Sequence, residues 1–136
     1  MSGATGTTGG TTAVGEKGVA VNETERLISA DKVEGTAVYN RQGESIGSVY
    51  TVMIDKYSGQ VAYAVMSFGG FLGIGESYHP LPWKVLDYDT NKGGYVVDLD
   101  KRKLEGAPTY RTGEEPIYTR EYGRSVYDYY GVPYGV

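Results

Sequence analysis

Few side chains in this sequence are of the types that carry out chemistry, and their spacing decides what they could do. The chain has one histidine, His79, and no cysteine. A lone histidine with no second ligand or nucleophile near it in the sequence predicts neither a metal site nor a catalytic centre, because both need several converging groups. The absence of cysteine excludes disulfides, thiolate zinc sites and cysteine nucleophiles. We therefore expect a structural role for His79 and predict no catalytic residues.

An acidic segment has part of the spacing of a calcium-binding loop. Asp87, Asp89 and Asn91 alternate along the chain, and Asp98 follows further on. A calcium loop of the helix–loop–helix type needs glycine at its sixth position and helices on both sides. Lys92 occupies that position, and the flanking residues favour strands. A solvated hairpin turn is the expected structure, so we predict no metal site and no cofactor.

Residues 69–75, Gly-Gly-Phe-Leu-Gly-Ile-Gly, have the glycine content of a phosphate-binding loop. A phosphate cradle needs a helix N-terminus directly after the loop, where backbone N–H groups point at the anion. Prolines and strand-forming residues follow here, including Pro80 and Pro82. The loop is therefore expected to be a flexible connection between strands.

Apolar side chains on this connection are the candidate partner-binding residues. A closed β-unit does not need to bury them, and the flanking glycines would let the tip move. Aromatic residues are enriched at protein interfaces. We predict that the protein contacts a partner, or a second copy in a homodimer, through the 69–78 loop and the adjoining edge. The predicted contact residues are Phe71, Leu72, Ile74 and Tyr78.

Charge and hydropathy exclude other kinds of partner. The formal net charge is −4 and the isoelectric point is near 5.0, so nonspecific attraction to nucleic acid is not expected. No apolar run approaches the roughly 20 residues that a membrane-spanning helix needs. The first residues have neither the basic region nor the apolar core of a secretory signal. The expected location is the cytoplasm, and the partner, of unknown identity, is expected to be a protein.

The sequence divides into three parts. Residues 1–26 are rich in glycine and threonine and contain no run that could bury a face, so disorder is expected. Residues 27–107 hold the strand-forming segments and are expected to form one domain. Residues 108–136 are polar and rich in tyrosine and glycine, and neither the strand period nor the helix period is recognised in them. We therefore expect a flexible tail.

Short strands separated by turn residues fill the middle part. Gly and Asn mark turns at 40–43, 56–59 and 89–94, and Pro80 and Pro82 indicate an edge strand or a corner. Asp100 is expected to cap a helical turn at 101–105. The expected strands are 36–39, 45–54, 60–68, 78–82, 83–88 and 95–99.

The apolar patterns of the second and third strands predict how these strands contribute to the core. In the second strand Ile46 and Val49 are three residues apart, whereas Val52 and Ile54 are two apart. Both pairs can face one core only if a bulge lies near residues 47–50. Both faces of the third strand, which includes Val65, are apolar, which predicts a central strand covered on both sides. The predicted core consists of Val38, Ile46, Val49, Val52, Ile54, Val61, Tyr63, Val65, Leu81, Trp83, Val85, Val97 and Leu104.

Several motifs together resemble the PRC-barrel domain family. They are Gly35-Thr36-Ala37-Val38-Tyr39, residues 43–49, Ile54-Asp55 before Ser58-Gly59, the 69–75 loop and Pro80-Leu81-Pro82-Trp83. The family includes the cytoplasmic domain of the photosynthetic reaction-centre H subunit and the C-terminal domain of a ribosome-maturation factor. The resemblance covers about residues 27–107 and implies an all-β fold, a small six-stranded antiparallel barrel, with one short C-terminal helical turn and flexible termini.

Two hypotheses about function follow. The resemblance implies a non-catalytic interaction or scaffold module, because the family shares no catalytic residues. The alternative is a small-ligand or metal-binding domain accessory to an enzyme, which would use the glycine loop or Asp87 and Asp89.

Overall fold

The computed structural model describes residues 26–68 and 76–135. The chain forms two units, residues 1–32 and 33–136. Of the first unit, the structure describes residues 26–32, where the Lys32 N–H donates to the Ser29 carbonyl at 2.9 Å. Helix α1 (Ala30–Val33) begins in this unit. The second unit, from Val33 onward, contains the β-sheet.

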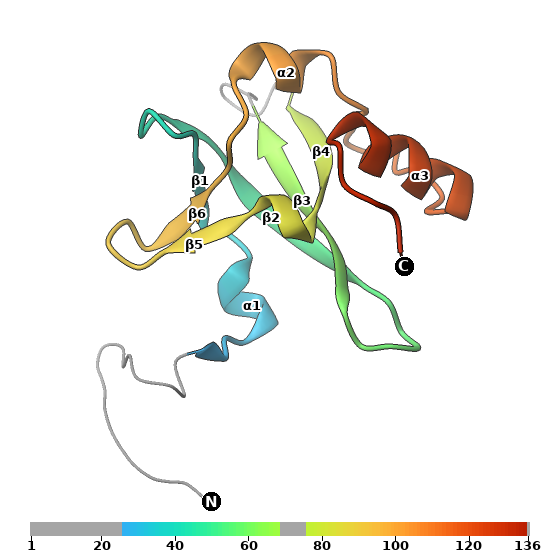
Figure 1. The fold of residues 1–136 in the computed structure, drawn as a ribbon, viewed down its shortest axis with the longest axis horizontal. Helices are drawn as coiled ribbons and strands as arrows, with labels where there is room; N and C mark the ends of the chain where they lie inside the picture. The colour runs from blue at the N-terminus through green and yellow to red at the C-terminus, as the bar shows by residue number, and fades with distance from the viewer. Residues whose placement is uncertain (1–25, 69–75, 136) are drawn as a thin grey trace, which may run out of the picture. The chain divides into compact units, whose positions relative to one another are not determined.

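The second unit is built on one sheet of seven short strands (Figure 1). Their order across the sheet is β5-β6-β1-β2-β3-β4-β7. The strands are β1 (Ala37–Tyr39), β2 (Ser45–Ile54), β3 (Val61–Phe68), β4 (Ser77–Pro82), β5 (Asp87–Asp89), β6 (Gly94–Val96) and β7 (Tyr110–Arg111). A 3-10 turn η3 (Trp83–Val85), helix α2 (Lys101–Glu105) and helix α3 (Arg120–Tyr129) complete the described elements.

The predicted closed barrel of six antiparallel strands is only partly right. The fold is mostly β, but β1 and β6 pair in parallel. Within the parts of the chain that the structure describes, β5 and β7 end the sheet and do not pair with each other. The expected strand at 83–88 is instead a 3-10 turn followed by β5, because the Leu86 N–H turns back to the Trp83 carbonyl at 3.1 Å.

The predicted bulge in β2 is confirmed. Val49 pairs with Met66 and Thr51 pairs with Val65, so Tyr50 is the extra residue. Such a bulge bends its strand and re-aims the side chains beyond it. Val49 thus packs into the core while the Tyr50 side chain lies on the other face, against Tyr78.

The prolines of β4 lie at an edge, as predicted. Pro80 and Pro82 pair with β3 on one side. On the other side, β7 pairs only with Ser77 and Tyr78. Proline has no N–H to give to a second neighbour, so it fits the part of β4 that has one partner strand.

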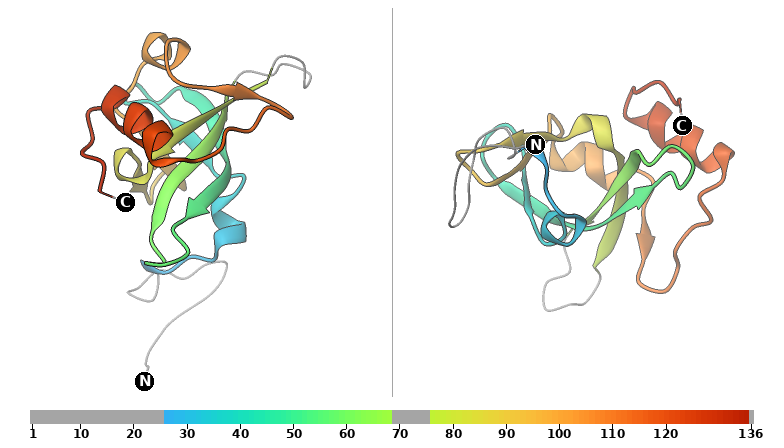
Figure 2. Two further views of the ribbon diagram at one scale, coloured as in Figure 1. Left: turned by 90° about the vertical axis from the view of Figure 1, so that its right-hand side faces the viewer. Right: turned by 90° about the horizontal axis from the view of Figure 1, so that it is seen from below.

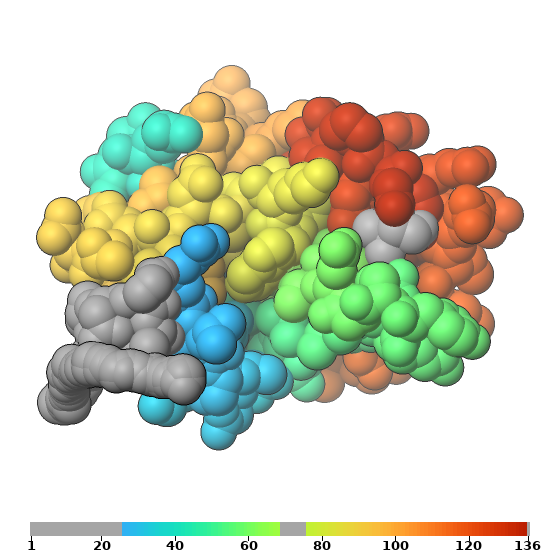
Figure 3. Space-filling view, turned by 60° about the horizontal axis from the view of Figure 1, so that its bottom comes forward, coloured from blue at the N-terminus to red at the C-terminus, as the bar shows by residue number. Residues whose placement is uncertain are grey.

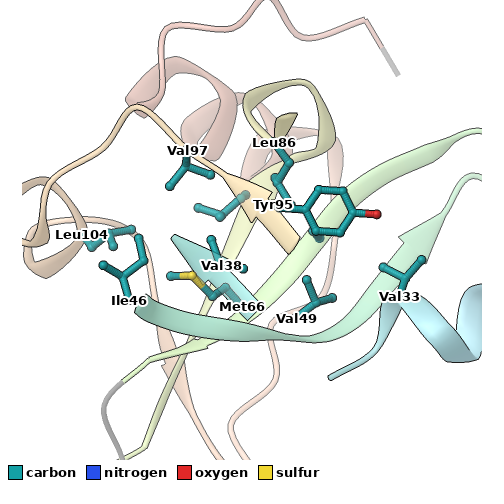
Figure 4. Close-up of a cluster of buried hydrophobic side chains, with 11 residues drawn as sticks. Val33, Val38, Ile46, Val49, Met66, Leu86, Tyr95, Val97 and Leu104 are labelled. Carbon is teal, nitrogen blue, oxygen red and sulfur yellow. The ribbon is translucent and has the colours of Figure 1, made fainter. Parts of the chain in front are cut away.

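The sheet curves around one core (Figure 4). Tyr95 of β6 and Leu81 of β4 belong to the same buried cluster although three strands separate β6 from β4. We call this set the inner core and the side of the sheet that it covers the inner face. The inner core consists of Val33, Val38, Ile46, Val49, Ala64, Met66, Leu81, Leu86, Tyr95, Val97 and Leu104.

Most of the predicted core is correct. The residues found buried are Val38, Ile46, Val49, Tyr63, Val65, Leu81, Val97 and Leu104. Val52, Val61, Trp83 and Val85 are half-buried. The prediction for Ile54 is wrong, because this residue ends β2 beside the Asp55–Gly59 turn and is 52% exposed.

The opposite side of the sheet, the outer face, is covered by the C-terminal residues (Figure 2). Along β3, Ala64 and Met66 join the inner core, whereas Tyr63 and Val65 lie on the outer face. The prediction that β3 is covered on both sides is therefore confirmed. We call the outer cover around Tyr63 the tyrosine cluster. It consists of Ala62, Tyr63, Val126 and Tyr127, with Met53, Tyr118, Tyr122, Tyr130, Val132 and Tyr134 packed against them.

The expectation that residues 108–136 lack regular structure is wrong. Thr119 caps α3 by accepting a hydrogen bond from the Tyr122 N–H at 3.1 Å. Val126 of the helix is completely buried. The residues of the helix and its C-cap that face the sheet side are Tyr122, Gly123, Val126, Tyr127 and Tyr130, which follow the spacing of a single helical face. This spacing was the signal that could have predicted α3. Disorder was also predicted for residues 1–26, of which residues 1–25 lie outside the described part.

Gly123 lets α3 approach the sheet closely. A Cβ at this position would lie 2.5 Å from the Tyr134 ring and 2.7 Å from the Tyr63 hydroxyl oxygen. Any larger residue would have to push one of these rings away. The fit between α3 and the outer face therefore depends on a residue without a side chain.

Candidate functional site

A groove opens where the start of β3, the η3 turn and the C-terminal segment meet. Figure 3 shows the face on which these three parts come together. Its volume is about 470 Å³. The lining residues are Gln60, Val61, Trp83, Lys84, Tyr127, Pro133 and Gly135.

The aromatic walls of the groove are held in place from behind. The Trp83 ring packs on the inner core and meets the Tyr95 ring edge-on, with 5.6 Å between ring centroids. The Tyr127 hydroxyl donates to the Ala62 carbonyl oxygen at 2.7 Å in a buried position. Side chains anchored in this way lose little further conformational freedom when a ligand binds.

Among the described lining residues, one side chain is charged. Lys84 is exposed on η3 and carries the positive charge. Burial raises the pKa of Tyr127, and the neighbouring Tyr134 raises it further, so the Tyr127 hydroxyl is neutral at physiological pH. The lining therefore offers apolar and aromatic contact, the Gln60 amide and a single cation.

Removal of the Tyr127 hydroxyl oxygen should measurably lower the stability of the fold. Tyr127→Phe leaves the buried Ala62 carbonyl without its donor, so we expect the free energy of unfolding to fall by about 1–3 kcal/mol. Urea denaturation of both proteins measures this difference. Tyr57→Phe is the control, because Tyr57 is 93% exposed and should keep the stability of the parent. Equal stability of all three proteins would show that the hydrogen bond contributes nothing.

Of the four partner-contact residues predicted from the sequence, the structure describes only Tyr78. Phe71, Leu72 and Ile74 lie outside the described residues, and their contact with a partner stays a prediction. Tyr78 is described and is only 7% exposed. Its ring lies between Tyr50, at 4.7 Å between centroids, and Tyr110, at 5.3 Å. In this structure Tyr78 is an internal packing residue of the outer face.

His79 lies in an apolar setting on β4. The residue is 2% exposed, and the Phe68 ring meets its imidazole edge-on. Its Nε2 atom lies 3.2 Å from the Ser77 hydroxyl oxygen. Burial lowers the pKa of His79 to about 4, so the ring is neutral at physiological pH.

The acidic segment forms the turn that was expected. The Asp89 carboxylate accepts hydrogen bonds from the N–H groups of Asn91, at 2.9 Å, and Lys92, at 3.2 Å. Arg41 lines the shallow pocket beside this turn and pairs with Asp98 at 3.4 Å. Among residues 26–68 and 76–135, no three carboxylate or histidine side chains gather where they could hold a metal ion.

A comparison with known protein families identifies the domain that contains most of the β-sheet. The family model of the PRC-barrel domain matches residues 25–104. No protein of curated function matches the chain. In the part of the chain that is described, none of the helices is long and apolar enough to cross a membrane.

The matched region ends within α2, before β7 and α3 begin. Trp83 and Lys84 therefore belong to the matched region, whereas Tyr127 and Pro133 lie beyond it. The sequence prediction missed the groove because its two walls are distant in the chain. Only the spacing of the residues in α3 could have indicated the second wall.

Proposed function

Because the chain belongs to the PRC-barrel domain family, we propose that it is a non-catalytic protein-interaction module that binds its partner in the groove between η3 and the C-terminal segment. The observation that carries the proposal is the pair of anchored aromatic walls, Trp83 and Tyr127. Tryptophan and tyrosine dominate the binding energy of many protein interfaces, because they bury a large area at a low cost in side-chain entropy.

The groove also suggests the form of the bound segment. Grooves lined by aromatic rings bind extended peptide segments, which lie between the rings without forming new secondary structure. Trp83 and Tyr127 provide such walls, and Pro133 adds a further apolar surface. Lys84 at the rim favours a segment that carries an acidic residue at the matching position.

Photo-crosslinking tests this proposal. A photoreactive amino acid replaces Lys84 in the full-length protein, which is then irradiated in its native cells. The matched control carries the same amino acid at Lys92, an exposed lysine on the turn between β5 and β6. We expect a defined protein adduct from position 84 that is missing from position 92. The introduction of Pro133→Glu, which places a carboxylate in the groove, should weaken that adduct at least about tenfold, since tenfold corresponds to only about 1.4 kcal/mol of binding energy. Identical adducts from positions 84 and 92 would contradict the proposal.

A further inference from the structure

The C-terminal segment, residues 112–135, is an added cover on the outer face. It lies entirely beyond the match to the PRC-barrel family. The Tyr63 ring of β3 contacts the rings of Tyr118, at 5.2 Å between centroids, and Tyr127, at 5.7 Å. Val126, also in the segment, is completely buried. The outer face is therefore a docking surface for a helix, and in this structure the chain's own helix occupies it.

The contact is specific enough to recognise one helix. A Cβ at Gly123 would lie within 2.7 Å of the Tyr63 hydroxyl oxygen and of the Tyr134 ring, so a larger residue would have to displace one of them. The Tyr127 hydroxyl reaches the Ala62 carbonyl, and the Tyr129 hydroxyl donates to the Lys103 carbonyl on α2. The Lys103 ammonium also lies over the Tyr129 ring, 4.2 Å from its centroid. The helix that matches this surface is the one that this chain carries.

The segment is joined to the sheet by a mostly exposed connection, residues 113–117. Glu114 and Glu115 are exposed, and Ile117 is 83% exposed. The chain has no cysteine, so no disulfide fixes the segment in place. The cover also carries a defect, because the buried Tyr130 hydroxyl has no hydrogen-bond partner among the described residues. An unpaired buried hydroxyl lowers the cost of opening the contact.

We propose that the C-terminal segment is exchanged between two copies of this chain. Helix α3 of one copy docks on the outer face of β3 and β4 of the second copy, and the second copy returns the same contact. The exchange closes a symmetric dimer that keeps the docking contacts of the monomer. The partner assigned to this surface is a second copy, which extends the proposed function as an interaction module. Each groove of the dimer then has Trp83 from one copy and Tyr127 from the other.

The connection sets the balance between the two forms. Both forms make the same docking contacts, so they differ in how easily residues 113–117 span the distance to each surface. A tethered segment has an effective concentration of about 1 mM at its own surface, which favours the monomer in dilute solution. A deletion of Glu114 and Glu115 shortens the connection by about 7 Å at full extension. The shorter connection strains the monomer and leaves docking onto a second copy as the unstrained alternative.

The test compares three full-length proteins by size-exclusion chromatography with light scattering. We expect the protein lacking Glu114 and Glu115 to be a dimer. A control with two glycines inserted after Glu115 should be a monomer, because a longer connection reaches its own surface without strain. The parent protein is unfolded and then refolded at about 1 mM, because at this concentration docking onto a second copy competes with docking of the tethered segment. We expect the refolded sample to contain a separable dimer fraction.

A mixed sample of isotope-labelled and unlabelled copies identifies the contact. In the exchanged dimer, a filtered nuclear Overhauser experiment should detect Gly123 of one copy beside the Tyr63 ring of the other. Monomers only, in both the deletion variant and the refolded parent, would overturn the proposal. A dimer without the contact between copies at Gly123 and Tyr63 would overturn it equally. If the deletion variant does not fold, the refolded parent alone decides. The crosslinking result at Lys84 stands in either case, so failure of the exchange is distinguishable from failure of the proposed function.

Discussion

Replacing Leu81 by alanine is expected to lower the free energy of unfolding by about 2–5 kcal/mol. Leu81 is completely buried in β4 and belongs to the inner core. The substitution removes buried methyl groups and leaves a cavity that the surrounding sheet cannot fill completely. Urea denaturation monitored by circular dichroism measures the change.

The matched control is Ile54→Ala. Ile54 is also a β-strand aliphatic residue that the sequence placed in the core, but it is 52% exposed. Its truncation should change the free energy of unfolding by less than about 1 kcal/mol. Equal losses in the two variants would contradict the assignment of Leu81 to the core and Ile54 to the surface.

Acidification from pH 7 to pH 5 should destabilise the protein by about 2 kcal/mol through His79 alone. Burial lowers the pKa of His79 to about 4 in the folded state, whereas an unfolded histidine keeps a pKa of 6.5. Between these two values the unfolded chain binds a proton that the folded chain does not bind. Stability therefore falls as the pH falls from 6.5 towards 4, and it is unaffected by His79 above that window.

The window from pH 7 to pH 5 isolates this effect. His79 is the only histidine of the chain, and most carboxylates titrate below pH 5. Urea denaturation at pH 7, 6 and 5 gives the slope, and His79→Gln provides the control, because glutamine does not titrate. We expect a flat profile for the variant over this range. The same slope in both proteins would assign the pH dependence to other groups.

The features predicted correctly from the sequence depend on local rules. The bulge at Tyr50 follows from the irregular spacing of apolar residues in β2, and the edge position of Pro80 and Pro82 follows from their missing N–H groups. The Asp100 cap of α2 is likewise a local signal, and its carboxylate accepts from the Lys103 N–H at 2.7 Å. The parallel pairing of β1 with β6 joins residues far apart in sequence. No local pattern carries that information.

Helix α3 was missed because the tyrosine-rich and glycine-rich segment was counted as polar and no helical period was recognised in it. The tyrosine ring buries a large apolar area and needs only one partner for its hydroxyl. Counted as apolar, Tyr122, Val126, Tyr127 and Tyr130 form one helical face. The two apolar faces of β3 already implied that a second layer must cover the sheet, and α3 is that layer.

The candidate site could be predicted only in part. The sequence predicts Trp83 as a core residue, but its position in a groove depends on Pro133, which lies beyond the region matched by the family model. The loop with Phe71 and Leu72 was identified from its composition, and its contact with a partner stays a prediction. A groove formed by distant residues requires the three-dimensional fold before it can be recognised.

The open sheet leaves two edges at which another strand could pair. An unpaired edge strand offers its N–H and carbonyl groups to any other strand. At one end of the sheet, β5 carries Asp87 and Asp89, so a second copy of this strand laid alongside would bring carboxylates together. At the other end, β7 is only two residues long, and the part of β4 that it leaves unpaired contains Pro80 and Pro82, which have no N–H to donate. Both edges are thus built in ways that disfavour the addition of a further strand.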